Sequence, residues 1–181
     1  MKKFFRLVLS MGLILSFGGC TWVGDKIRAT KSEKIIAEIN AESNFDLPLL
    51  TPLDGFDKTA FKPINGWMGA EEYYPKRYAS ENEQVVVTYL FSGYPDVVND
   101  WVLTGIFFTD SAICLYGLTV DNTLEEWKSK LEEKGFEKAD GNMYFEKYKN
   151  QSVSIDFSLD ENDVTKISVR LNATNRSNIM Y

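Results

Sequence analysis

Hydrophobic positions in the second half of the chain follow patterns that are typical of β-strands. Residues 85–91 and 101–108 are runs of β-branched and aromatic side chains, apolar on both faces, which predicts strands covered on both sides. The apolar run 112–118 is predicted to be a further strand. Over residues 153–157 and 165–171 apolar and polar residues alternate, as they do in strands that have one wet face.

A helix over residues 31–43 is predicted by isoleucines at helical spacing. Thr30 and Glu33 have the three-residue separation of a capping box, in which both side chains satisfy free backbone N–H groups. The apolar stripe behind this box is expected to dock the helix: Ile35, Ile36 and Ile39.

The clearest helical signal covers residues 123–134. Thr123 and Glu126 form a second capping box, and Gly135 is placed to end the helix in a left-handed cap with a hydrophobic contact across it. Glu126 and Lys130 have the order of a favourable i,i+4 ion pair. The buried face is predicted to consist of Leu124, Trp127 and Leu131, with Trp127 as the anchor against the sheet.

These elements together predict one α+β domain over residues 31–171, an antiparallel β-sheet of about five or six strands with two helices packed on it. Residues 45–84 contain four prolines and no clear period, so short strands or a helical turn at 70–73 are expected within them. The polar residues 172–181 are predicted to form a frayed C-terminal tail.

A faint similarity relates two parts of the predicted sheet. Aligning residues 84–93 with residues 151–160 places Val86 beside Val153, and the strands that follow these segments also align. Both pairs of strands could be hairpins of one kind. Alternating strands resemble one another by default, so the same similarity also arises without a duplication.

The first residues of the chain have the parts of an export signal. Three cationic residues and no acidic residue accompany an apolar run over residues 7–17, which is shorter than the roughly 20 residues of a membrane-spanning helix. Gly18 and Gly19 then precede Cys20. This junction resembles the lipobox of bacterial lipoproteins, in which a small residue precedes a cysteine that is lipidated and becomes the mature N-terminus. Phe17 stands where that family usually has leucine.

The resemblance implies a signal peptide of residues 1–19 and a lipid-anchored tether of residues 20–30. The domain would then be held at the extracytoplasmic face of a bacterial membrane by its lipid. Thr21 follows the cysteine, which in a double-membraned cell implies the outer membrane. The alternative is an ordinary secretory signal that is cut at Gly19.

Charge restricts the class of partner. Removing residues 1–19 from the 181-residue chain leaves 162 residues and takes away three positive charges and no negative ones, so the net charge changes from −6 to −9. An acidic chain repels nucleic-acid phosphates and anionic lipid headgroups. We therefore expect no DNA or RNA partner, and a membrane attachment that comes from the lipid.

The absence of histidine from the sequence excludes several kinds of chemistry. Ser-His-Asp and Cys-His nucleophile systems and His-ligated zinc or haem sites all need that residue. Cys114 lies in an apolar run, where we expect a small buried hydrophobe and not a reactive thiol. No cofactor, metal or catalytic residue is predicted.

Two acidic sequences are weaker candidate sites. The turn over residues 160–163 could bind calcium, but it lacks the glycine and distal glutamate of an EF-hand loop, so a solvated hairpin turn is the favoured interpretation. Glu71 and Glu72 could serve a carboxylate-dependent hydrolase that acts on an envelope glycan. Adjacent residues, however, do not face each other across a substrate.

The aromatic segment from residue 67 to residue 78 is the main candidate for partner binding. Tyrosine, tryptophan and arginine are enriched at binding hot spots, and nearby prolines and glycines place part of the segment on a surface loop. Alternatively, the rings fill the core beside the sheet. The residues predicted to contact an envelope protein or glycan are Trp67, Tyr73, Tyr74, Lys76, Arg77 and Tyr78.

Overall fold

The computed structural model describes residues 31–45, 47–64, 76–92, 100–161 and 163–172. The chain divides into two units, Met1–Ile35 and Ile36–Tyr181, and every strand belongs to the second. No helix among the described residues is long and apolar enough to cross a membrane.

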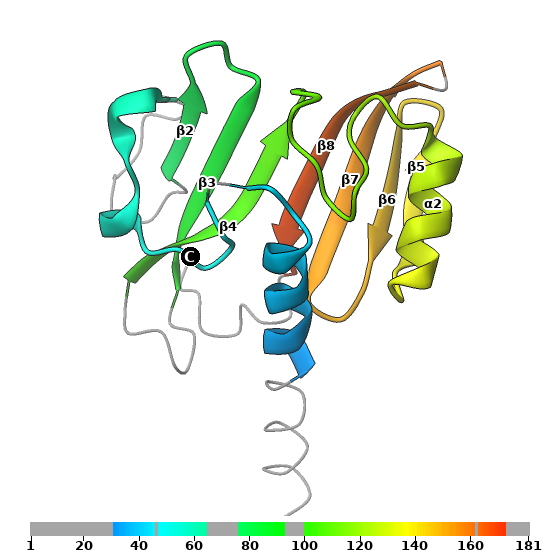
Figure 1. The fold of residues 1–181 in the computed structure, drawn as a ribbon, viewed down its shortest axis with the longest axis horizontal. Helices are drawn as coiled ribbons and strands as arrows, with labels where there is room; N and C mark the ends of the chain where they lie inside the picture. Colours follow the sequence, from blue (N-terminus) through cyan, green and yellow to red (C-terminus); the bar gives the residue numbers. More distant parts are fainter. Residues whose placement is uncertain (1–30, 46, 65–75, 93–99, 162, 173–181) are drawn as a thin grey trace, which may run out of the picture. The chain divides into compact units, whose positions relative to one another are not determined.

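The described strands form one antiparallel sheet in the order β1-β2-β3-β4-β8-β7-β6-β5 (Figure 1). The α+β class with a single antiparallel sheet is therefore confirmed, but the sheet has eight strands and not five or six. The strands are β1 (Phe61–Pro63), β2 (Lys76–Ser80), β3 (Val85–Ser92), β4 (Asp100–Phe108), β5 (Glu137–Asn142), β6 (Phe145–Lys149), β7 (Val153–Asp160) and β8 (Asp163–Leu171).

The strands that the sequence pattern marks least clearly lie at the edges of the sheet. All six residues of β5 are exposed, so no buried apolar position marks it as a strand. Its charged residues and the irregular register between Lys138 and Asp140 are features that discourage pairing with another chain. At the opposite edge β1 is only three residues long and ends in Pro63. Together, β1 and β2 confirm the expectation of short strands within residues 45–84.

The prediction of a strand over residues 112–118 is wrong. Tyr116 and Gly117 have φ angles of 56° and 77°, and they form a tight turn in which Leu115 and Leu118 exchange backbone hydrogen bonds of 2.9 and 3.0 Å. Two consecutive positive φ angles reverse the chain and cannot continue a strand. The burial that the pattern indicated is real, because Leu115 is fully buried in this loop.

One face of the sheet, which we call the covered face, carries the core. The paired positions that run across β3, β4, β8 and β7 share this face and are buried: Val87, Ile106, Val169 and Ile155. Helix α2 (Leu124–Glu133) lies against the β5–β7 side of it (Figure 1). Trp127 is fully buried there, with its ring centroid 5.3 Å from that of Phe157, which confirms it as the anchor.

The opposite face differs between the two halves of the sheet. In β3 and β4 it is buried as well, since Val86 and Val102 are only 4% and 0% exposed, which confirms strands covered on both sides. In β7 and β8 it is polar, and the Nε atom of Arg170 donates a hydrogen bond of 3.0 Å to Asp156. The wet face predicted from the alternation of these strands is therefore confirmed.

The residues that are aligned between 84–93 and 151–160 do not occupy equivalent positions in the sheet. Strands β3–β4 and β7–β8 do form two hairpins. However, Val87 shares the covered face with Ile155, and side chains alternate along a strand. Val86 therefore points to the face opposite Val153, with which it was aligned. In this register the similarity reflects alternation and not duplication.

Helix α2 has both predicted ends. The backbone N–H of Thr123 donates to Glu126, and the backbone N–H of Glu126 donates to the Thr123 hydroxyl, which completes the capping box. Gly135 has a φ angle of 77°, and the backbone N–H of buried Phe136 donates to the Leu131 carbonyl, as in a Schellman cap. The i,i+4 pair with Lys130 is absent, because Glu126 is engaged in the cap and Lys130 pairs with Glu133 at 2.8 Å.

We predict that replacing Thr123 by alanine lowers the free energy of unfolding by about 1 kcal/mol, since the backbone N–H of Glu126 loses the hydroxyl that accepts its hydrogen bond. The Thr123 backbone N–H, its hydroxyl and Asn122 hold the pKa of Glu126 below its ordinary value of about 4.3. The stability that ionised Glu126 contributes is therefore present above about pH 4.3. It is lost as the pH falls through the pKa that Glu126 has in the folded state. Urea unfolding of wild type and Glu126→Gln should show a stability difference at pH 7 that shrinks at pH 3.

The N-terminal helix covers residues 31–41, two residues fewer than predicted. Its predicted capping box pairs Glu33 with Thr30, and Thr30 lies outside the described residues. Ile36 and Ile39 are buried as expected. Lys134, at the end of α2, donates to Glu42 at 2.6 Å and to Glu38 at 2.9 Å, which raises its pKa. Two short 3-10 helices, η1 (Leu53–Gly55) and η2 (Lys58–Ala60), precede β1.

Candidate functional site

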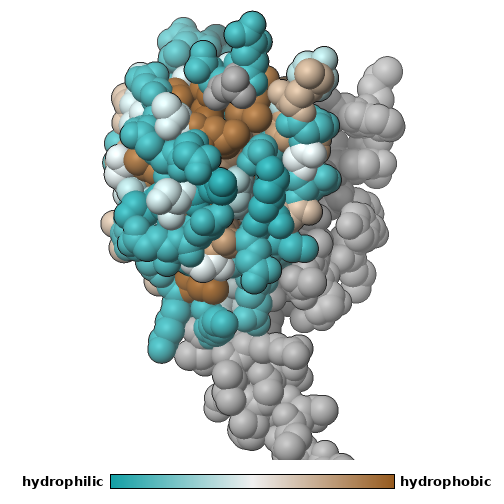
Figure 2. Space-filling model, turned by 90° about the vertical axis from the view of Figure 1, so that its right-hand side faces the viewer, coloured by the Kyte–Doolittle hydropathy of each residue, from teal (hydrophilic) through white to brown (hydrophobic). Residues whose placement is uncertain are grey.

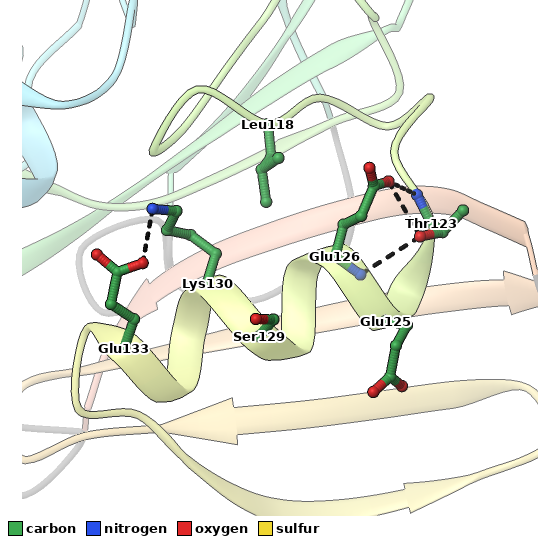
Figure 3. A pocket seen from close by; sticks show the side chains of 7 residues that line it. All are labelled: Leu118, Thr123, Glu125, Glu126, Ser129, Lys130 and Glu133. Atoms are coloured by element: carbon green, nitrogen blue, oxygen red, sulfur yellow. Dashed lines mark hydrogen bonds and ion pairs between the residues drawn. The ribbon is translucent and has the colours of Figure 1, made fainter.

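An open groove with a volume of about 660 Å³ runs between α2 and the loop that precedes it. Figure 3 shows Leu118 facing the helix, with Lys130 and Glu133 at one end of the groove and Thr123 and Glu126 at the other. The volume is within the range of small-molecule sites. The residues that line it are Leu118, Thr123, Glu125, Glu126, Ser129, Lys130 and Glu133.

Two of the three carboxylates that line this groove, those of Glu126 and Glu133, are poorly suited to acid catalysis. The capping box holds the pKa of Glu126 below its usual value, and the hydrogen bond from Lys130 does the same for Glu133. A glycosidase needs one carboxyl group with a raised pKa, so that it is protonated at neutral pH. Both side chains are instead ionised acceptors that already have partners.

The turn between β5 and β6 exposes two large apolar side chains, Met143 and Tyr144, which we call the hairpin tip. Each is 70% exposed, whereas the next large apolar residue in the described part of the chain, Ile64, is 38% exposed. Seen from the side of β5 and α2, the surface is mostly hydrophilic, and hydrophobic side chains gather near its upper end (Figure 2). Met143 and Tyr144 are therefore the two most exposed large apolar side chains in the described part of the chain.

Local hydrogen bonds hold the hairpin tip in place. The Asn142 side-chain oxygen accepts from the backbone N–H groups of Tyr144 at 2.8 Å and of Phe145 at 3.2 Å. The Tyr144 carbonyl accepts from the backbone N–H of Leu159 at 2.8 Å, which connects the tip to β7. The two exposed side chains thus stand on a fixed backbone.

The turn at the hairpin tip does not require special residues. Two-residue hairpin turns favour Asn-Gly or Asp-Gly where the central residues have positive φ angles. Neither Met143 nor Tyr144 is among the non-glycine residues that have a positive φ. The backbone therefore accepts these two residues, and it is their exposure to water that is unfavourable.

An acidic turn lies beside the hairpin tip. Asp160 and Asp163 close the β7–β8 hairpin as a directly opposed pair, and the adjoining Leu159 is the residue that hydrogen-bonds Tyr144. This agrees with a hairpin turn over residues 160–163. Calcium binding is not supported, because the described residues contain no group of three or more acidic, cysteine or histidine side chains that could hold a metal ion.

The residues predicted for partner binding are only partly described. Trp67, Tyr73 and Tyr74 lie outside the described residues, as do Glu71 and Glu72. The described residues of the set, Lys76, Arg77 and Tyr78, lie in strand β2 and not in a loop.

Tyr78 points to the covered face, where its ring centroid is 5.2 Å from that of Phe56 and 6.2 Å from that of Tyr89. Burial raises the pKa of Tyr89 to about 12, so the centre of this cluster is neutral core. Much of the Tyr78 ring is therefore used in packing. Lys76 lies 4.3 Å from the Trp101 ring, and Arg77 is exposed. Their role in binding stays a prediction.

The two cysteines are not equally described. Cys20 lies outside the described residues, so its lipidation stays a prediction. Cys114 is partly exposed, which corrects the expectation of a buried side chain. The cause is the loop that replaces the predicted strand: the Cys114 backbone N–H donates to the Asn44 side chain at 2.8 Å, near the surface.

Comparisons of the chain with protein-family models, with characterised proteins and with solved structures give no match.

The sequence pattern did not single out Met143 and Tyr144 as a candidate site. The available signal was their position between Asn142, a turn-forming residue, and the alternating residues of β6. Recognising it required strand β5, which has no apolar pattern of its own.

Proposed function

We propose that this chain is a non-catalytic binding module, attached through a lipid on Cys20 to the extracytoplasmic face of a bacterial membrane. It binds a protein of the cell envelope through the hairpin tip, Met143 and Tyr144. The observation that carries the proposal is the 70% exposure of these two adjacent apolar side chains on a hydrogen-bonded turn.

Physical arguments support binding at this place. Tyrosine offers a large contact area with little conformational freedom to lose, and it is enriched at binding hot spots. The fixed turn reduces the ordering cost of association further. Burial of the two side chains in a partner would also relieve their unfavourable exposure to water.

The membrane location is supported by the residues before Cys20, which resemble a lipobox. The acidic charge of the chain gives no attraction to anionic lipids, so the attachment is assigned to the lipid on Cys20. The segment of residues 67–78 remains a second predicted contact. A carboxylate-dependent hydrolase is less well supported, since Glu126 and Glu133 of the α2 groove have lowered pKa values.

The test removes the two apolar side chains and keeps a residue that tolerates the turn at each position. In the double variant Met143→Asn/Tyr144→Asn, the free energy of unfolding measured in urea should change by less than about 0.5 kcal/mol, because both side chains are exposed. Formation of a crosslinked adduct with the envelope partner should fall at least ten-fold, the loss of about 1.4 kcal/mol that is expected for a hot spot. The adduct is measured after formaldehyde treatment of cells that make the full-length protein.

Ile64→Asn is the matched control, because Ile64 is the other exposed large apolar residue among those described and lies beside β1. It should leave the adduct unchanged. If the double variant unfolds the domain, the tip is structural. If the domain is stable and the adduct persists, the binding site is elsewhere.

A further inference from the structure

The hairpin tip and the acidic turn form one continuous surface. The hydrogen bond from the Leu159 backbone N–H to the Tyr144 carbonyl, 2.8 Å long, places the last residues of β7 beside the tip. Phe145 and Ser158 are paired in the same register, so the β5–β6 and β7–β8 turns leave the sheet at the same end. Any partner that buries Tyr144 therefore also approaches Asp160.

The acidic turn is electrostatically uncompensated. Asp160 and Asp163 lie directly opposite each other, and like charges in that arrangement are destabilising. Glu161 adds a third exposed carboxylate with a φ angle of 56°, a conformation that is uncommon for a non-glycine residue. None of these three residues takes part in an ion pair among the described residues.

We infer that the hairpin tip and the acidic turn together dock into an apolar pocket on the partner protein that is bordered by lysine or arginine side chains. This inference rests on the proposed function and specifies the chemistry of the partner. The pocket would remove Met143 and Tyr144 from water, and its basic border would neutralise Asp160, Glu161 and Asp163. Charge complementarity of this kind directs association and excludes wrong partners.

Other occupants fit the same surface less well. An anionic membrane would be repelled by the three carboxylates. A second copy of this surface would bring two acidic turns together, which is unfavourable. A neutral glycan could stack on Tyr144 but would leave the acidic turn without a counter-charge.

The experiment places the photocrosslinking residue p-benzoyl-phenylalanine at position 144 of the full-length, lipidated protein in its own cells. The adduct is measured with and without the charge reversal Asp160→Lys/Asp163→Lys. Because that reversal also changes the net charge, the matched control is Glu81→Lys/Glu83→Lys in the exposed β2–β3 turn, where Glu83 also has a positive φ, of 58°. Unfolding in urea checks that every variant is folded, and Asp160→Asn/Asp163→Asn replaces the reversal if it is not.

We expect a protein adduct at position 144 that falls at least ten-fold with the reversal at 160 and 163, or at least three-fold with the asparagine pair. It should be unchanged by the reversal at 81 and 83. An adduct that survives the change at 160 and 163, or that both reversals weaken equally, overturns the basic border and leaves the proposed function standing. An adduct to lipid or glycan, or no adduct at position 144, overturns both.

Discussion

Replacing Trp127 by alanine is expected to lower the free energy of unfolding by about 3–5 kcal/mol, the usual loss for a buried tryptophan. The side chain is fully buried between α2 and the sheet, and its ring lies 5.3 Å from that of Phe157. Its indole N–H also donates a 3.0 Å hydrogen bond to the Thr119 carbonyl. Truncation would therefore leave a cavity in the core and remove one of the two donors to the Thr119 carbonyl, which also accepts from the Asn122 backbone N–H at 3.2 Å.

Urea unfolding at neutral pH measures this loss. Trp127→Phe should lose less stability than Trp127→Ala, because a phenyl ring keeps contact with Phe157, although the Thr119 carbonyl still loses the indole donor. Lys128→Ala, on the outer side of the same helix turn, should change stability by less than about 0.5 kcal/mol. A Trp127→Ala variant that matches Lys128→Ala would mean that α2 is not anchored as described.

Replacing Cys20 by serine is expected to abolish acylation of the protein and to remove it from the membrane fraction. The hypothesis rests on the Gly18-Gly19-Cys20 junction behind a short apolar run. Lipid is attached to the thiol, so serine cannot substitute for it, and the domain has no basic excess to hold it on anionic lipid. Mass spectrometry of the N-terminal peptide and membrane fractionation provide the measurements.

Cys114→Ser is the matched control within the same chain. Cys114 lies in the loop beside Asn44, far along the sequence from the predicted export signal, so its loss should change neither acylation nor membrane attachment. A wild-type protein without an acyl chain would contradict the lipoprotein hypothesis and would favour an ordinary secretory signal cut at Gly19.

Features that depend on neighbours in the sequence were predictable. The capping box of Thr123 and Glu126 and the left-handed cap at Gly135 involve residues within one helical turn, and both are present. The alternation in β7 and β8 and the doubly buried pattern of β3 and β4 likewise arise within single strands.

Features that depend on distant partners were not predictable. Strand β5 has six exposed residues and is a strand because β6 supplies its hydrogen-bonding partners. The apolar run 112–118 predicts a strand, yet the consecutive positive φ angles of Tyr116 and Gly117 make it a loop in which Leu115 and Tyr116 are buried. Apolar content indicates burial, and it cannot by itself distinguish a loop from a strand.

The same division applies to function. The sequence by itself determined the acidic charge and the absence of histidine chemistry, and it predicts the export signal. These are properties of residue order and composition. Only the tertiary structure placed Met143 and Tyr144 at an exposed tip beside Asp160, since the exposure of an apolar residue depends on which other segments cover it. Burial and proximity are set by contacts between distant parts of the chain, and a linear pattern does not contain them.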